Sequence, residues 1–159
     1  MADLVVIPAR FSTKVVAVPD GCRFWVGAIA DDGYGRWTTD DDRTVSAHRW
    51  LWEQLHGPVP PGLHLLHSCD ETSCVDDAHL RVGTQAENQA QMARRHRGAG
   101  PWHVGMADTR GPAGRARAIR AALLAGYDAE RLAAALAAGD ANRDQLRLDL
   151  GESGPATRR

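Results

Sequence analysis

The stretch LHLLHSCDETSCVDDAHLRVGTQAENQA, residues 63–90, predicts two short strands joined by a polar loop and followed directly by a helix. Leu63–His67 and residues 80–82 alternate or cluster apolar side chains, as strands do, and the Pro60-Pro61-Gly62 turn precedes the first of them. Thr84 is a helix-capping residue with Glu87 three positions later, the spacing of a reciprocal capping box. The predicted order is therefore strand, loop, strand, helix.

Two polar residues in this stretch, His67 and Asn88, have the chemistry and the predicted positions needed to hydrolyse a phosphodiester. Hydrolysis needs a base that deprotonates water and a divalent cation that neutralises the departing oxygen. His67 ends the first predicted strand, and Asn88 lies one turn into the predicted helix. A strand, a return loop and a helix can bring the base and a metal ligand to the same point, so the pair fits this chemistry.

The loop between the strands has the composition of a structural zinc site. His67, Cys69, Cys74 and His79 follow the spacing H-x-C-x4-C-x4-H, and zinc prefers thiolate and imidazole ligands in a closed tetrahedron. We expect Cys69, Cys74 and His79 to bind zinc, with His48 as the fourth ligand, because a zinc-bound His67 could not accept a proton. Alternatively, His48 contacts a phosphate or packs in the core, and the two cysteines are plain buried thiols. Cys22 is expected to be a small buried residue.

Upstream of this stretch the chain is predicted to be rich in short strands and then helical. Ser46 is a candidate cap for a helix that ends at Gly57. The expected strands, separated by Pro, Gly and Asp-rich turns, are Leu4–Ile7, Lys14–Val18, Arg23–Ile29 and Tyr34–Thr38. Together with the later elements they predict an α+β fold.

Downstream, the sequence predicts a linker and a separate helical unit. We expect a β-rich segment and catalytic domain over residues 1–98, a Gly- and Pro-rich linker over 99–112, a helical unit over 113–150 and a flexible tail over 151–159. Two helices joined at Gly126, with a third that Asp140 could cap, have the proportions of a helix-turn-helix DNA-binding unit. The alternative is a plain alanine-rich helical hairpin used for packing or dimerisation.

Net charge, the distribution of arginines and hydropathy indicate whether the chain binds nucleic acid or a membrane. The 159 residues are 43% hydrophobic and carry a net charge of −1, which by itself argues weakly against nucleic-acid binding. Arginines are nevertheless concentrated downstream of the predicted catalytic stretch, and this distribution predicts DNA contacts, although a GC-rich genome would also favour arginine. The candidates are Arg81, Arg94, Arg95, Arg97, Arg115 and Arg117. No apolar run is long enough for a membrane span and no signal peptide is evident, so we expect a cytoplasmic protein without a membrane partner.

Residues 22–98 resemble the HNH (ββα-metal) endonuclease family, in particular its phage and actinobacterial homing-type branch. The resemblance rests on motifs in a fixed order, each weak alone. These are Cys22-Arg23-Phe24-Trp25-Val26-Gly27, Gly33-Tyr34-Gly35, Ala47-His48-Arg49, Gly57-Pro58-Val59-Pro60-Pro61-Gly62, His67-Ser68-Cys69-Asp70, Cys74-Val75, His79-Leu80, Gly83-Thr84, Glu87-Asn88 and Arg97-Gly98.

The resemblance implies that His67 is the general base and that Asn88 is a ligand of a catalytic Mg²⁺ or Mn²⁺, with DNA as the substrate. It also places the cysteines in a structural role. Two residues depart from the family pattern: Leu66 and Gln91 stand where many relatives carry acidic metal ligands. They favour the alternative of a zinc-stabilised DNA-binding protein that has lost catalysis. A purely structural module built on the alanine-rich helices is a second alternative. If the enzyme cuts both strands, two copies are needed, which predicts a homodimer.

Overall fold

The computed structural model describes residues 6–19, 21–90 and 108–139 of the chain, and within them it has an α+β fold. Three of the residues predicted to contact DNA, Arg94, Arg95 and Arg97, lie outside this part of the chain. So do Gln91, most of the predicted linker, the predicted third helix and the C-terminal tail. No helix among the described residues is long and apolar enough to cross a membrane.

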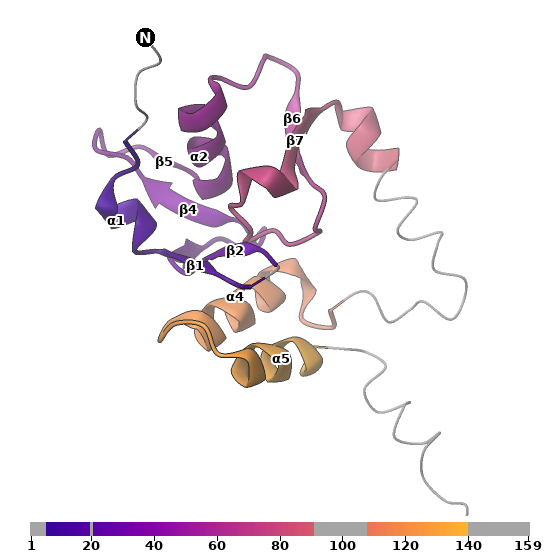
Figure 1. The fold of residues 1–159 in the computed structure, drawn as a ribbon. Coiled ribbons are helices and arrows are strands. Elements are labelled where there is room, and N and C mark those ends of the chain that lie inside the picture. The colour runs from indigo at the N-terminus through magenta and orange to yellow at the C-terminus, as the bar shows by residue number, and fades with distance from the viewer. Residues whose placement is uncertain (1–5, 20, 91–107, 140–159) are drawn as a thin grey trace, which may run out of the picture.

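The N-terminal part contains two small antiparallel sheets and one short helix (Figure 1). The helix α1 (Ala9–Ser12) precedes the first sheet, in which β1 (Val15–Ala17) pairs with β2 (Arg23–Trp25). The second sheet has the order β3-β4-β5, with bounds Ala28–Ile29, Gly35–Thr38 and Thr44–Ser46. The β-rich prediction is confirmed in outline. It missed α1 and β5, and it ran β2 and β3 together as one strand.

Aromatic residues from these elements form the first hydrophobic core. Phe11 of α1 packs against Trp25, with ring centroids 4.8 Å apart, and against the edge of Trp37 at 5.1 Å. Both tryptophans are almost fully buried, at 1% and 3% exposure. These large side chains therefore hold the small sheets together, as expected when aromatic rings supply most of the apolar surface of a thin scaffold.

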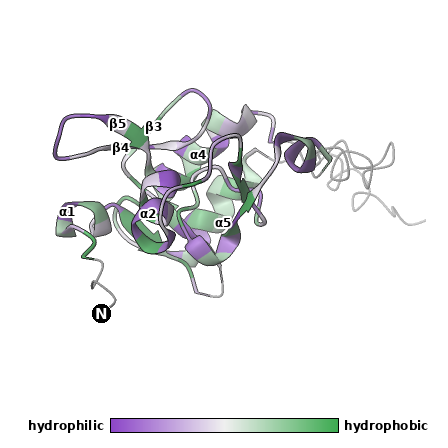
Figure 2. Cartoon of the chain, turned by 90° about the horizontal axis from the view of Figure 1, so that it is seen from above, coloured by the Kyte–Doolittle hydropathy of each residue, from purple (hydrophilic) through white to green (hydrophobic). Residues whose placement is uncertain are grey.

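The helix α2 (Ala47–His56) packs against this core with its apolar face. Ala47 and Leu51 are buried one turn apart, whereas Gln54 is exposed, and Figure 2 shows both apolar and polar colour on the helix. Ser46 precedes the helix, but its hydroxyl accepts a hydrogen bond from Arg36 Nη1 at 2.8 Å and makes no cap bond. Gly57 ends the helix with φ of 85°, a left-handed conformation that glycine adopts without strain.

The predicted strand, loop, strand and helix are present. The third sheet pairs β6 (His64–His67) with β7 (Leu80–Gly83), and the loop between them contains the short helix η1 (Asp77–His79). Residues 85–90 are helical. The capping box is confirmed, because the Thr84 hydroxyl accepts from the Glu87 amide at 3.2 Å and the Glu87 carboxylate accepts from the Thr84 amide at 2.6 Å.

The C-terminal hairpin packs onto the N-terminal strands and shares a core with them. It consists of α4 (Gly111–Leu123) and α5 (Ala129–Ala137), and Figure 1 shows both helices beneath β1 and β2. Ile119 and Leu123 of α4 are fully buried in a second hydrophobic cluster with Phe24 of β2 and Leu132 of α5. The hairpin thus differs from the separate unit expected from the sequence: its apolar face completes the core of the preceding residues.

Candidate metal centre and reaction site

The β6–β7 hairpin places His67 at the point where the strand meets the loop. His67 pairs with Leu80 and Leu66 with Arg81 across the two strands. Successive side chains of a strand point to opposite faces. Leu66 is buried at 3% exposure, whereas His67 is half-buried. Leu66, the residue just before His67, is therefore turned into the apolar core.

Three cysteines and one histidine meet beside the loop. The ligand atoms of Cys22, Cys69, Cys74 and His79 all lie within 4.8 Å of one another. Cys74 Sγ and His79 Nδ1 are 3.6 Å apart. Zinc–sulfur bonds of about 2.3 Å in a tetrahedron put the ligand atoms roughly 3.8 Å apart, so this group has the size of a zinc cage. The cluster can hold a metal ion.

Backbone pairing brings Cys22 to the loop. The Trp25 amide donates to the Ser73 carbonyl and the Val75 amide to the Arg23 carbonyl, each at 2.8 Å. These bonds lay the loop beside β2, and Cys22 immediately precedes that strand. Hydrogen bonds from the Cys22 thiol and then from Cys74 lower the pKa of Cys69, whereas the hydrogen bond to Cys69 raises the pKa of Cys22. Without a metal ion, the thiolate is therefore favoured at Cys69 alone.

The fourth member of the cluster corrects the expectation from the sequence. Cys22, expected to be only a small buried residue, occupies the place assigned to His48, while Cys69, Cys74 and His79 are where they were expected. The reason is topological: β2 runs beside the loop, whereas α2 approaches from the side of His67. The odd cysteine count was a usable signal, because three cysteines and one histidine make a complete zinc ligand set.

His48 lies instead against the proposed base. Its ring is 5.0 Å from the rings of both His67 and Tyr34, and the residue is 8% exposed. Burial lowers its pKa to about 3, with further lowering by His67, Arg36 and Arg49 and an opposing effect of Asp32. The imidazole is therefore neutral at physiological pH. Its Nδ1 is buried and has no hydrogen-bond partner among the described residues.

The His67 ring is held by the backbone of a metal-cluster residue. His67 Nε2 lies 3.1 Å from the Cys74 carbonyl oxygen. A carbonyl oxygen only accepts hydrogen bonds, so Nε2 donates, and the neutral ring carries its proton there. The basic lone pair is then on Nδ1. The same loop that gathers the cysteines thus fixes which nitrogen of His67 can take up a proton.

Four other candidate residues lie in the part of the chain that the structure describes. Asn88 is half-buried in the first turns of the helix that follows β7, and its backbone amide donates to the Thr84 carbonyl at 3.0 Å. Arg81 is about half exposed, with Nη1 3.7 Å from Glu87. Arg115 does not face solvent freely as a DNA contact would, because it is paired with Glu71.

Arg117 remains accessible. Its guanidinium donates to Asp31 at 2.6 Å, but Asp31 is fully exposed and Arg117 is 52% exposed. Solvent-exposed ion pairs of this kind contribute only about 0–1 kcal/mol. A phosphate can therefore replace Asp31 at low cost.

The comparisons with known proteins agree with this geometry. The profile of the HNH endonuclease family matches residues 45–90, which include His48, His67, three members of the cysteine–histidine cluster and Asn88. The chain belongs to the HNH endonuclease family. Cys22 and the C-terminal hairpin lie outside the matched residues.

Three bacteriophage proteins are similar to this chain. Protein 7.7 of Escherichia phage T7 is 36% identical over 81 residues, covering 50% of this chain and 61% of the relative. Protein 2.8 of the same phage is 34% identical over 85 residues, covering 53% and 58%. The uncharacterized gene 5.3 protein of Enterobacteria phage T3 is 34% identical over 70 residues, covering 40% and 69%. The chain thus spans about three fifths of the length of the first two relatives. No solved structure matches significantly.

Proposed function

We propose that this chain is a metal-dependent DNA endonuclease in which His67 is the general base. The observation that carries the proposal is the hydrogen bond from His67 Nε2 to the Cys74 carbonyl. It leaves the lone pair of the neutral ring on Nδ1, and a neutral imidazole is the usual general base near neutral pH.

In the proposed reaction, His67 Nδ1 takes a proton from a water molecule as its oxygen bonds to phosphorus. The phosphorus–oxygen bond to the leaving nucleotide breaks, and the leaving oxygen takes up a proton from solvent. Asn88 would hold a Mg²⁺ or Mn²⁺ ion, which when bound supplies the positive charge that stabilises the phosphate in the transition state. A single amide ligand such as Asn88 fits a cation that binds together with the substrate, because Mg²⁺ sites often combine one or two protein oxygens with phosphate oxygens. Leu66 is buried and offers no ligand.

The cysteine–histidine cluster is proposed to bind a structural zinc ion. Cys22, Cys69, Cys74 and His79 make a closed set of four ligands, the arrangement of structural rather than catalytic zinc. His67 is outside the set, so the zinc ion would not occupy either of its ring nitrogens. Binding of zinc would stabilise a loop that has little regular secondary structure of its own.

We propose DNA contacts for five arginines, two of which are among the described residues. Arg81 lies on β7, next to the strand that carries His67, and half of its side chain is exposed. Arg117 can exchange its exposed carboxylate partner for a phosphate. Arg94, Arg95 and Arg97 follow Asn88 in sequence, outside the described residues, and we retain them as candidates. Phosphate contacts would give affinity and orientation without reading the sequence. A homodimer stays a prediction.

The second candidate function is a zinc-stabilised DNA-binding protein without catalysis. The buried Leu66, in place of an acidic ligand, is the observation that favours it. Supercoiled plasmid incubated with Mg²⁺, Mn²⁺ or EDTA separates the two. The endonuclease proposal predicts cation-dependent nicking that His67→Ala abolishes.

The matched control is His64→Ala, because His64 lies on the same strand with an exposed side chain. It should nick like the unmodified chain. DNA binding without nicking under any of these conditions would establish the second candidate instead.

A further inference from the structure

The loop between β6 and β7 is held on two sides. On one side lie the backbone hydrogen bonds to β2. On the other side the contacts come from side chains: Arg115 of α4 grips Glu71 through Nε, 3.0 and 3.1 Å from the two carboxylate oxygens, and through Nη2. Thr72 Oγ1 donates to the Gly33 carbonyl at 3.0 Å. The C-terminal hairpin therefore contacts the loop that carries the metal cluster.

Resting on the proposed function, we propose that Arg115 is a positioning residue of the reaction site, which holds the Cys74 carbonyl against His67 through Glu71. The sequence pattern assigned Arg115 to DNA. The structure places it at the start of a short chain of contacts that ends on the base.

The contact chain has three steps. Arg115 binds the Glu71 carboxylate in a forked geometry, which restricts orientation as well as distance. The Glu71 carbonyl accepts from the Cys74 amide at 3.0 Å, which closes a tight turn. The Cys74 carbonyl then accepts from His67 Nε2. A shift of Glu71 is passed through this turn to a hydrogen bond that orients the base.

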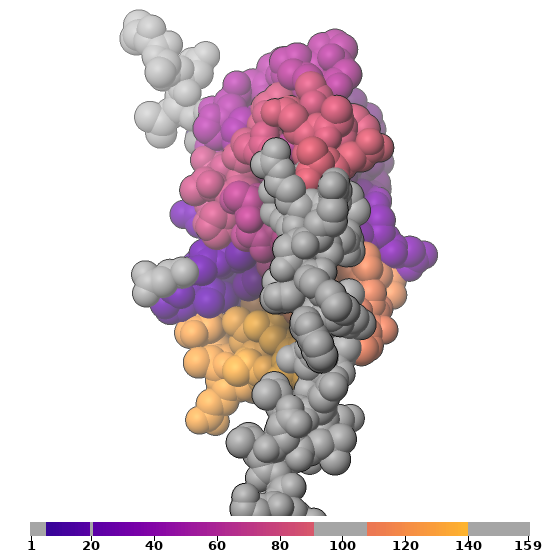
Figure 3. All heavy atoms as spheres, turned by 90° about the vertical axis from the view of Figure 1, so that its right-hand side faces the viewer, coloured from indigo at the N-terminus to yellow at the C-terminus, as the bar shows by residue number. Residues whose placement is uncertain are grey.

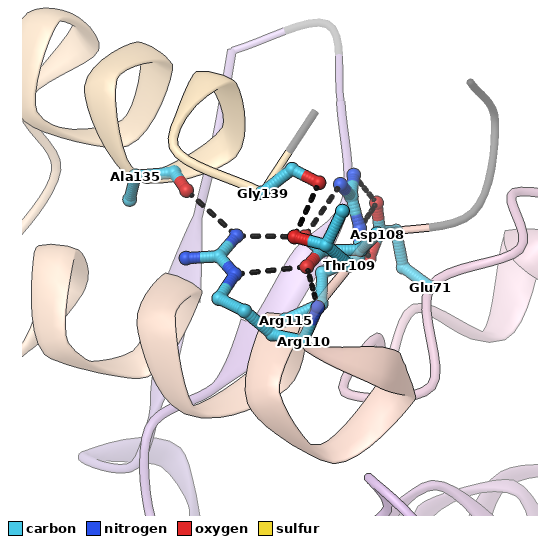
Figure 4. A network of polar contacts seen from close by, with 7 residues as sticks. All are labelled: Glu71, Asp108, Thr109, Arg110, Arg115, Ala135 and Gly139. Atoms are coloured by element: carbon cyan, nitrogen blue, oxygen red, sulfur yellow. Dashed lines mark hydrogen bonds and ion pairs between the residues drawn. The ribbon is translucent and has the colours of Figure 1, made fainter. Parts of the chain in front are cut away.

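Arg115 can act as a fixed point because its own surroundings are rigid. Asp108, whose side chain is 4% exposed, lies 3.7 Å from Arg115 Nη1 and accepts three hydrogen bonds from Arg110. Arg110 also donates to the Ala135 carbonyl of α5 at 2.9 Å (Figure 4). Figure 4 shows the two guanidinium groups on either side of the Asp108 carboxylate. The Arg115–Glu71 pair is thereby connected to both helices of the hairpin.

Close packing at the turn before β4 supports the same role. Gly33 has φ of 85°, and a Cβ there would lie 2.7 Å from Thr72 Oγ1 and 2.9 Å from the Pro112 backbone. The loop, the turn and the start of α4 therefore meet with no spare volume. Figure 3 shows residues 60–90, in magenta to salmon, above the hairpin, in orange and yellow. A DNA phosphate would have to displace Glu71 and Asp108 to reach Arg115.

The test compares Arg115→Met with Arg131→Met in the full chain. Methionine keeps an apolar stem and removes the charged fork. Arg131 lies in the same hairpin, and its ion pair with Asp128 is long, at 3.9 Å, and exposed. We expect Arg115→Met to lower kcat for plasmid nicking about 10-fold to 100-fold, the cost of misplacing a reacting group by about 1 Å. KM and DNA affinity should change less than about twofold, and Arg131→Met should match the unmodified chain.

A second readout follows His67 directly. The ¹⁵N spectrum of the side chain should show the Nε2–H tautomer in the unmodified chain and a mixture of tautomers in Arg115→Met. Arg115→Lys, which keeps the charge without the fork, should recover part of the rate. Glu71→Gln replaces Arg115→Met if the latter fails to fold, since it keeps the size of the side chain and weakens the same contact.

Two results would overturn the proposal. One is a nicking rate and tautomer in the variant equal to those of the unmodified chain. The other is a loss of DNA affinity as large as the loss of rate, which would make Arg115 a DNA contact. If the unmodified chain does not nick at all, the proposed function fails, while the tautomer comparison still tests the positioning role by itself.

Discussion

Replacing Cys22 by serine removes one ligand from the metal cluster and changes little else, because the two side chains have nearly the same shape. Removing an outer-shell partner of a metal ligand already weakens metal affinity about 10-fold to 100-fold. Loss of a thiolate ligand should therefore weaken zinc binding at least about 100-fold. Cys22 is 9% exposed, so solvent cannot readily take its place.

The effect on stability follows from mass action. At a free zinc concentration about 1,000 times the Kd, binding stabilises the folded chain by about 4.1 kcal/mol, and at 10 times the Kd by about 1.4 kcal/mol. The 100-fold weaker site thus costs about 2.7 kcal/mol. For a chain of this size, that lowers the Tm by about 5–10 °C.

Metal content by plasma mass spectrometry, chelator competition and thermal unfolding measure these changes. His48→Asn is the control, because His48 was the ligand expected from the sequence and lies beside His67 in the structure. It should keep one zinc per chain. The reasoning is refuted if Cys22→Ser retains zinc at the original affinity and His48→Asn loses it.

Two further predictions concern buried ionisable side chains. His48 has a folded pKa of about 3 against 6.5 when exposed, so the unfolded chain binds the extra proton as the pH falls. Proton uptake by the unfolded chain therefore lowers the free energy of unfolding below pH 6.5, by about 2 kcal/mol at pH 5. Urea unfolding of His48→Asn should show a correspondingly flatter pH dependence. An unchanged slope would contradict the burial argument. Arg110 holds the pKa of Asp108 at about 2. The Asp108 carboxylate therefore stabilises the fold above pH 3.8, and this stabilisation is lost as the pH falls toward 2. Asp108→Asn should cost about 3 kcal/mol in chemical unfolding at pH 7, the cost of breaking a buried ion pair. Asp41→Asn, at an exposed pair, is the control and should leave the free energy of unfolding nearly unchanged.

Local signals predicted the elements nearest the site. The Thr84–Glu87 capping box and the strand ending on His67 depend on residues a few positions apart, and both were confirmed. The loop residues Cys69, Cys74 and His79 lie close enough together to hold a metal ion, as their spacing indicated. Such features are set by short-range hydrogen bonding and by ligand chemistry, which a single sequence displays directly.

Contacts between distant segments were not predicted from the sequence. Cys22 reaches the loop through pairing of β2 with residues 73–75, and nothing in the local sequence specifies that pairing. Arg115 illustrates the same limit: in the sequence it belongs to a basic stretch, whereas in the structure Glu71 and Asp108 neutralise it. The hairpin looked separate because the residues before it are rich in Gly and Pro, yet Ile119 and Leu123 are buried beside Phe24.

A crystal structure of the chain with a DNA duplex and a divalent cation would test the central claim most directly. The account predicts His67 Nδ1 directed at the scissile phosphate, Asn88 on the cation, and zinc enclosed by Cys22, Cys69, Cys74 and His79. A His67 ring that is bound to zinc, or that points away from the phosphate, would contradict it.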